Sequence, residues 1–390
     1  MAKRLYALDT LRGFAALSIV LWHWQHFYAV SGTWQEGWQK SAQPFYLFLK
    51  PFYDEGWAAV DLFFALSGFI FFWLYSEAIG EGRMGAARFA WLRFSRLYPL
   101  HLVTLLAVGA MQYIFHRATG NYFIFDTNDA QHFVTNLFLA QQWLPPTLEQ
   151  SFNGPAWSVS IEVLLYGVFF VFCRMGQRGL GIMLCVALAA VPLMWWQFFI
   201  ARGLMGFFVG GATFHMSRIV AARADARRIA QWSVVIALGL WAVIWIETYF
   251  GPLHAAFYWL SAHISPEVGR FYVGYSTRAF LLLFIFLVVP ATLLALALHE
   301  QVLGGAWHRF AFVGDISYST YMLHFPMQLA LALVAVRFAL TPAVFQNPLA
   351  LILFYIVLIV LGGLSFHYFE RPMQNVLRDV ARKSSLAPEK

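Results

Sequence analysis

Charged side chains are scarce in this chain: Asp, Glu, Lys and Arg make up 12% of its 390 residues, against about 25% in a typical soluble domain. Hydrophobic residues make up 61% and aromatic residues 19%. This composition excludes an ordinary soluble domain and predicts a polytopic membrane protein. The net charge of +7 does not indicate nucleic-acid binding, because the basic residues gather at the ends of apolar stretches.

Cysteine is also rare, with Cys173 and Cys185 as the two examples, both in or beside apolar segments. They suggest neither a disulfide framework nor a metal site. The twelve histidines show no HExxH or similar zinc spacing, so we predict that no metal is bound. The basic start Met1–Arg12 is not followed by a small-residue cleavage site, so the first apolar segment is expected to remain as a membrane anchor.

About ten apolar stretches are long enough to be candidate membrane spans, and an α-helix needs about 20 apolar residues to cross a bilayer. They lie at roughly 13–31, 57–75, 98–115, 157–174, 180–197, 203–218, 231–249, 278–298, 314–337 and 349–369. The predicted fold class is therefore an all-α polytopic bundle of about ten transmembrane helices. No internal repeat divides it, so we expect one transmembrane domain over residues 1–370 and a tail over 371–390.

Lys and Arg alternate strongly between the loops, and the loops that hold Arg12, Arg93 and Arg96 are the richer set. The positive-inside rule places that set, and both termini, in the cytoplasm, with the chain in the cytoplasmic (inner) membrane. The outer loops at 32–56, 116–156 and 250–277 are long and rich in aromatic and amide side chains. Such loops suit sugars, and they equally suit a membrane-interface belt.

Two histidines fall near the middle of predicted spans. His23 lies in the first span and His324, in the run SYSTYMLHFP, lies in the ninth. An ionisable group at such a depth is costly unless it is paired or faces a polar cavity, so His23 is a candidate catalytic residue. His324 is a candidate catalytic partner, with a structural role in a helix broken near Pro326 as the alternative. Arg12 precedes His23 by eleven residues, about 16 Å along a helix, which places it at the membrane surface.

Two carboxylates lie just below the predicted outer surface. Glu162, in NGPAWSVSIE, could orient a histidine or bind a sugar hydroxyl, and the alternative is favourable placement near a positive helix terminus. Asp61, in AVDLFFALSGF, has the same two interpretations. Ser67 of that run is not predicted to be a nucleophile, because no GxSxG motif surrounds it and a Ser-Gly pair in a membrane helix typically forms a packing notch.

Arg93 and Arg96 are one helical turn apart and precede a span predicted to begin at Tyr98-Pro99. Cytoplasmic anchoring would explain them. Arginine also suits phosphate recognition, and Arg12 is predicted on the same side of the membrane, so a phosphate site is favoured.

These runs together resemble the membrane acyltransferase-3 family. The similar segments are LDTLRGFAALSIVLWH, VDLFFALSGFIFFW, RFSRLYPLH, GPAWSVSIE, ISYSTYMLHFP and the FERP that contains Glu370. The family's arginine–ten residues–histidine motif corresponds to Arg12 and His23, and its paired-arginine motif to Arg93 and Arg96. Its Trp-Ser-x-x-x-Glu motif corresponds to Trp157, Ser158 and Glu162. Many relatives carry a C-terminal esterase-like domain, and this chain resembles the stand-alone form.

The resemblance implies an O-acyltransferase that moves an acyl group, acetyl or succinyl, from cytoplasmic acyl-CoA to a hydroxyl of a surface or secreted carbohydrate or glycolipid. The phosphates of acetyl-CoA or succinyl-CoA would rest on Arg12, Arg93 and Arg96, and Trp157 and Ser158 would contribute to substrate binding. His23 would remove the hydroxyl proton, with Glu162 and Asp61 orienting it.

Other routes and other classes of protein fit parts of the pattern. A one-step transfer is the simplest route, and an acyl-histidine intermediate is the alternative. A transporter or flippase of a glycan would also use buried charge and aromatic loops, but no internal symmetry is visible. The buried ionisable groups disfavour a purely structural scaffold.

Overall fold

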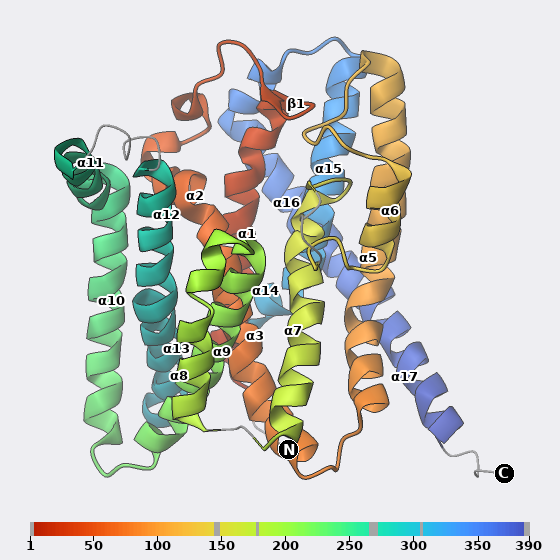
Figure 1. Ribbon diagram of the computed structural model, residues 1–390. Coiled ribbons are helices and arrows are strands. Elements are labelled where there is room, and N and C mark those ends of the chain that lie inside the picture. Colours follow the sequence, from red (N-terminus) through yellow and green to blue (C-terminus); the bar gives the residue numbers. More distant parts are fainter. Residues whose placement is uncertain (1–3, 144–148, 177–178, 265–271, 305–306, 386–390) are drawn as a thin grey trace. The chain divides into compact units, whose positions relative to one another are not determined.

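The computed structural model describes residues 4–143, 149–176, 179–264, 272–304 and 307–385. Almost all regular structure in these ranges is helical (Figure 1). The one described sheet is a two-stranded antiparallel ribbon of β1 (Ala29–Val30) and β2 (Thr33–Trp34). The prediction of an all-α multi-pass membrane protein is therefore confirmed.

Eight of the described helical segments are long and apolar enough to cross a membrane. They are Tyr46–Leu74, Ala86–Thr119, Gly154–Arg174, Phe198–Ala221, Ala226–Phe250, Tyr275–Leu303, Ser317–Arg337 and Pro348–Val380. The two remaining predicted spans are shorter: α1 (Tyr6–Trp22) has 17 residues, and a second apolar segment covers Leu180–Trp195. By this length criterion, eight of the about ten predicted spans are found among the described residues.

The chain forms two compact units, and the first combines residues 1–22, 49–77 and 176–314. Its helices are α1, α3 (Ala59–Leu74), α8 (Leu180–Ala189), α9 (Phe198–Ala221), α10 (Ala226–Phe250), α11 (Pro252–Ile264), α12 (Tyr272–Leu283) and α13 (Val289–Leu298), together with most of α2 (Tyr46–Glu55) and α14 (Ala311–Asp315). In this unit α3 packs closely along α9, since a Cβ atom at Gly68 would overlap the backbone of Phe207, and one at Gly210 the backbone of Ala65. The packing role predicted for the Ser67-Gly68 pair is confirmed for Gly68.

The second unit combines residues 23–48, 78–175 and 315–390. Besides β1 and β2 it holds the 3₁₀-helix η1 (His23–Tyr28), α5 (Ala86–Thr119), α6 (Ala130–Leu137), the 3₁₀-helix η4 (Gly154–Ala156), α7 (Trp157–Arg174), α15 (Ser317–Arg337), α16 (Pro348–Ser365) and α17 (Arg371–Ser385). A short helix, α4 (Ser76–Gly80), links the two sequence segments at the boundary. A π-helical turn, Phe366–Glu370, joins α16 to α17 without a break in the helix. The division at residue 370 into a domain and a tail remains a prediction.

Helix α5 corrects the position predicted for the paired arginines. The sequence suggested that a span begins at Tyr98-Pro99, because proline favours a helix start. Instead α5 has 34 residues from Ala86 to Thr119 with Pro99 in its interior. Arg93 and Arg96 therefore lie within a membrane-crossing helix and not in the loop before it. A neighbouring hydrogen-bond donor can satisfy the carbonyl that a proline leaves free inside a packed membrane helix, which propensity alone does not reveal.

The segment after α5, predicted as an outer loop, returns along α5. The imidazole Nε2 of His101 donates to the backbone carbonyl of Asn136 at 2.8 Å, although His101 is 18 residues before the end of α5. Gln112, also on α5, binds both backbone groups of Phe123. The segment thus folds back along α5, and we call it the re-entrant segment. Irregular backbone is tolerated between membrane helices where protein groups satisfy it.

A pair of buried glutamines tests this account of the re-entrant segment. Gln112 donates from Nε2 to the carbonyl of Phe123 at 2.9 Å and accepts its N–H at 3.0 Å. We expect Gln112→Leu to lower the free energy of unfolding by about 2–4 kcal/mol, because two buried backbone groups lose their partners.

The matched control is Gln142→Leu. The side chain of Gln142 is equally buried, but in the described part of the chain neither of its amide atoms has a hydrogen-bond partner. Its replacement is expected to leave stability unchanged or to raise it, since an unsatisfied amide is removed. Thermal unfolding of the purified protein measures both variants, and equal losses in the two would contradict the account.

Candidate active site

The second unit brings His23 and His324 into direct contact. Nδ1 of His23 and Nε2 of His324 are 2.8 Å apart, and both side chains are buried. The two rings are nearly parallel, with 10° between their planes and 4.9 Å between their centroids. Residues 301 positions apart in the sequence thus form one hydrogen-bonded histidine pair.

A second hydrogen bond of His324, made by its Nδ1 atom, fixes the direction of the bond between the two histidines. Nδ1 of His324 lies 2.5 Å from the backbone carbonyl oxygen of Tyr321. A carbonyl oxygen can only accept, so Nδ1 of His324 carries the proton and, in the neutral ring, Nε2 is the acceptor. The 2.8 Å contact therefore requires a proton on Nδ1 of His23. The lone pair of a neutral His23 is then on Nε2, which is the basic nitrogen of the pair.

A third histidine, His26, and a glutamine, Gln328, also contact His23. Nε2 of Gln328 donates to the backbone carbonyl of His23 at 2.9 Å. The Oε1 atom of Gln328 accepts from Nδ1 of His26 at 3.3 Å, and the His26 ring lies 4.5 Å from that of His23, centroid to centroid. The sequence analysis did not select His26 or Gln328. A signal was present, since each follows a selected histidine by about one helical turn.

The backbone of η1 begins at His23, where the α-helical pattern of α1 ends. Such 3₁₀ segments are common where a helix changes course at a functional position.

The helix that carries His324, α15, is continuous from Ser317 to Arg337 and is not broken at Pro326. Proline lacks the N–H that would bind the carbonyl of Met322, and Nδ2 of Asn153 donates to that carbonyl at 3.2 Å.

The start of α7 is attached to α15 next to the histidine pair. The hydroxyl of Tyr321 donates to the carbonyl of Pro155 at 2.6 Å and lies 2.7 Å from the hydroxyl of Ser158. Trp157 is buried at the first position of α7. Tyr321 precedes His324 by one turn and contacts its ring at 5.7 Å between centroids. Of the predicted substrate-binding residues, Ser158 is thus connected to the pair through Tyr321, and the role of Trp157 and Ser158 remains a prediction.

Glu162 and Tyr166 continue this polar face of α7 toward Arg93 on α5. Ser158, Glu162 and Tyr166 are spaced by four residues, so they share one face of the helix. The hydroxyl of Tyr166 donates to Oε1 of Glu162 at 2.6 Å, and the guanidinium of Arg93 lies 6.0 Å from the centre of the Tyr166 ring. From Ser158 to Tyr166 this face is about 12 Å long. A line of polar groups therefore connects the histidine pair with the first of the paired arginines.

Arg96 lies one turn further along α5, near a second carboxylate. It interacts electrostatically with Glu370 and with Tyr318. Glu370 accepts hydrogen bonds from the hydroxyls of Ser319 and Ser365, and Tyr318 donates to the carbonyl of Leu97 at 2.6 Å. The paired arginines, Glu162 and Glu370 thus form one charged cluster within the membrane-crossing helices of this unit.

Asp61 and Arg12 belong to the other unit. Both carboxylate oxygens of Asp61 accept from Arg202, at 3.0 and 2.7 Å, and both side chains are buried. This bidentate ion pair links α3 to α9. Arg12 donates to the carbonyl of Gly314 at 2.8 Å and lies 3.1 Å from the carboxylate of Asp9. The catalytic role predicted for Asp61 and the phosphate-binding role predicted for Arg12 remain predictions.

Comparison with known proteins decides the family. The model of the acyltransferase domain of the acyltransferase-3 family matches residues 5–368, nearly the whole chain. The chain belongs to this family. The match confirms the resemblance seen in the motifs.

Two relatives have similar sequences over part of this family domain. The acyltransferase MdmB of Streptomyces mycarofaciens is 32% identical over 178 residues, which are 45% of this chain and 41% of MdmB. Protein 2 in the picA locus of Rhizobium radiobacter is 30% identical over 203 residues, 49% of this chain and 94% of that protein. The chain thus matches less than half the length of MdmB. No solved structure gives a significant match.

Proposed function

We propose that this protein is an integral-membrane O-acyltransferase of the inner membrane that uses His23 as its general base. The donor is cytoplasmic acyl-CoA, with acetyl or succinyl as the acyl group, and the acceptor is a hydroxyl of a surface or secreted carbohydrate or glycolipid. The observation that carries the proposal is the hydrogen-bonded pair of His23 and His324, because its direction leaves the basic Nε2 on His23.

In the proposed reaction, Nε2 of His23 takes the proton from the acceptor hydroxyl as its oxygen attacks the thioester carbonyl carbon. The C–O bond forms, the C–S bond breaks, and the thiolate of CoA receives the proton from the imidazolium. His324 accepts the Nδ1–H of His23 throughout, which fixes the tautomer and stabilises the imidazolium as it forms. An acyl-histidine intermediate on Nε2 is the alternative route.

Arg93 and Arg96 are proposed to bind the donor's phosphates. Two arginines one turn apart in a membrane-crossing helix supply a strong positive potential, and the guanidinium group suits phosphate oxygens. The polar face of α7 from Tyr166 to Ser158 then provides about 12 Å of hydrogen-bonding surface between the arginines and the histidine pair. The pantetheine arm carries two amides that could follow such a surface. The comparisons give no support to the transporter alternative.

Donor binding supplies the first test of these roles. We expect Arg93→Ala and Arg96→Ala each to weaken acyl-CoA binding about 10- to 100-fold, the loss of one charge-assisted contact. Lysine at either position should restore binding only in part, because the planar fork is missing. Arg88→Ala, an exposed arginine of the same helix, is the matched control. Binding of acyl-CoA to purified protein gives the answer, and unchanged affinity in both Ala variants would place the donor elsewhere.

A further inference from the structure

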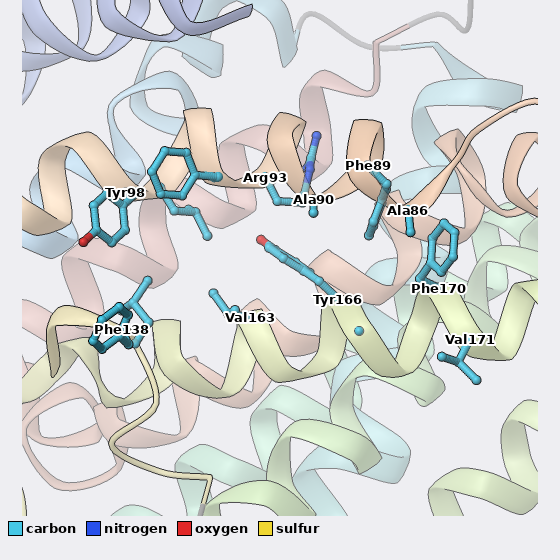
Figure 2. A pocket seen from close by; sticks show the side chains of 14 residues that line it. Ala86, Phe89, Ala90, Arg93, Tyr98, Phe138, Val163, Tyr166, Phe170 and Val171 are labelled. Atoms are coloured by element: carbon cyan, nitrogen blue, oxygen red, sulfur yellow. The ribbon is translucent and has the colours of Figure 1, made fainter. Parts of the chain in front are cut away.

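An apolar groove of about 650 Å³ runs between α5 and α7 in the second unit (Figure 2). Its lining residues recur every three or four positions on α5 from Ala86 to Tyr98, and on α7 from Val163 to Val171. Twelve residues of α-helix correspond to about 18 Å, so the groove is long and narrow. Figure 2 shows that Val163, Tyr166 and Phe170 project from α7 toward α5.

The walls of the groove are almost entirely hydrocarbon. Of the fourteen lining residues, Arg93 alone carries a charge. The groove is also open on one side, since Phe94, Phe138 and Val171 are exposed and a Cβ atom added at Gly167 would have nothing within 4 Å. Both helices are membrane-crossing segments. An open apolar groove between two such helices is expected to be filled by lipid chains in preference to water.

One arginine lies in the groove, and a second lies beyond one of its ends. Arg93 lies midway along it, over the ring of Tyr166. Arg174 is the last residue of α7, one turn beyond Val171, and is exposed. It ends the apolar span Gly154–Arg174 next to Phe170 and Val171, and its guanidinium donates to the carbonyl of Ile79 at 3.5 Å. Basic groups at such ends attract anionic lipid headgroups.

We propose that this groove is a binding site for an anionic phospholipid. One acyl chain lies along the groove between α5 and α7, and the phosphate lies at Arg174. The shape and hydrocarbon walls select a single extended chain, while Arg174 selects a negative headgroup. A chain in the groove covers Tyr166, the residue that donates to Glu162. The groove shares Arg93 and Tyr166 with the proposed donor path, so a bound lipid chain is expected to compete with acyl-CoA, whereas the headgroup position at Arg174 lies outside that path.

The test uses the full-length protein, purified in detergent and supplied with phosphatidylglycerol or with phosphatidylcholine of identical acyl chains. Native mass spectrometry counts the lipids that stay bound. The wild-type protein should retain phosphatidylglycerol about fivefold more tightly than phosphatidylcholine. Arg174→Gln should remove this preference and leave retention of phosphatidylcholine unchanged.

Gly167→Leu should reduce retention of both lipids, because the new side chain fills the groove. Gly239→Leu, on α10, is the matched control: Gly239 is also exposed, lies within a membrane-crossing helix and has nothing within 4 Å of an added Cβ atom. It should retain lipid as the wild type does. Equal retention of the two lipids by the wild type, or full retention by Gly167→Leu, would overturn the proposal. Acyl-CoA binding by Arg174→Gln, measured in parallel, should be normal, which separates this site from the donor site.

Discussion

Replacing His23 with alanine should lower the rate of acyl transfer by a factor of about 10² to 10⁴, the usual contribution of a general base. The protein should still reach the membrane in normal amounts, because the hydrogen bond from Gln328 to this position uses the backbone carbonyl of residue 23. Activity within a few-fold of the wild type would show that another group removes the hydroxyl proton.

His324 offers a sharper form of the same experiment, since it acts through His23. His324→Leu removes the acceptor for the Nδ1–H of His23, so the imidazole loses its fixed tautomer and kcat should fall strongly with little change in KM for the donor. His324→Gln presents an amide oxygen that can accept the same proton, and should restore part of the rate. A merely structural role would predict that both variants lose folded protein and that neither alters kcat in what remains. Rates per folded molecule distinguish the two cases.

Removing one partner of the Asp61–Arg202 ion pair should cause the largest loss of stability. Both side chains are buried, with exposed fractions of 0% and 4%, so a lone charge would be left in the interior of the first unit. Asp61→Ala or Arg202→Ala should lower the free energy of unfolding by about 3–5 kcal/mol.

The double replacement Asp61→Leu with Arg202→Met is the control, because it removes both charges and keeps apolar volume. It should recover most of the stability, as buried ion pairs replaced by hydrophobic residues often do. Chemical unfolding of the purified variants provides the measurement. If the double variant is stable and also transfers acyl groups, Asp61 acts in folding. If it is stable and inactive, the catalytic prediction for Asp61 gains support.

The sequence was sufficient to predict the fold class, because low charge and long apolar runs reflect the bilayer directly. Helix ends were predicted less well. Pro99 was interpreted as the start of a span, whereas α5 continues through it from Ala86. The re-entrant segment after Thr119 was also missed, since its anchors at Gln112 and His101 depend on tertiary contacts.

The sequence allowed candidate residues to be selected one at a time, but it did not show which of them contact each other. The cost of an ionisable group in a membrane marked His23, His324 and Asp61 one by one. Nothing local indicated that His23 would contact His324, or that Asp61 would pair with Arg202, 141 residues away. Glu162 was expected to orient a histidine, and the structure gives it a hydrogen bond from Tyr166. Hydrogen-bond direction, which selects Nε2 of His23 as the basic atom, requires the folded backbone.

The most direct test of acyl transfer through His23 is the mass of ester groups on the host's surface glycans. The protein would be deleted in its host, and the deletion strain complemented with the wild type or with His23→Ala at matched membrane levels. The account predicts that deletion removes an acyl mass increment, that the wild type restores it, and that His23→Ala does not. Restoration of the increment by His23→Ala, at equal protein level, would contradict the assignment of His23 as the base.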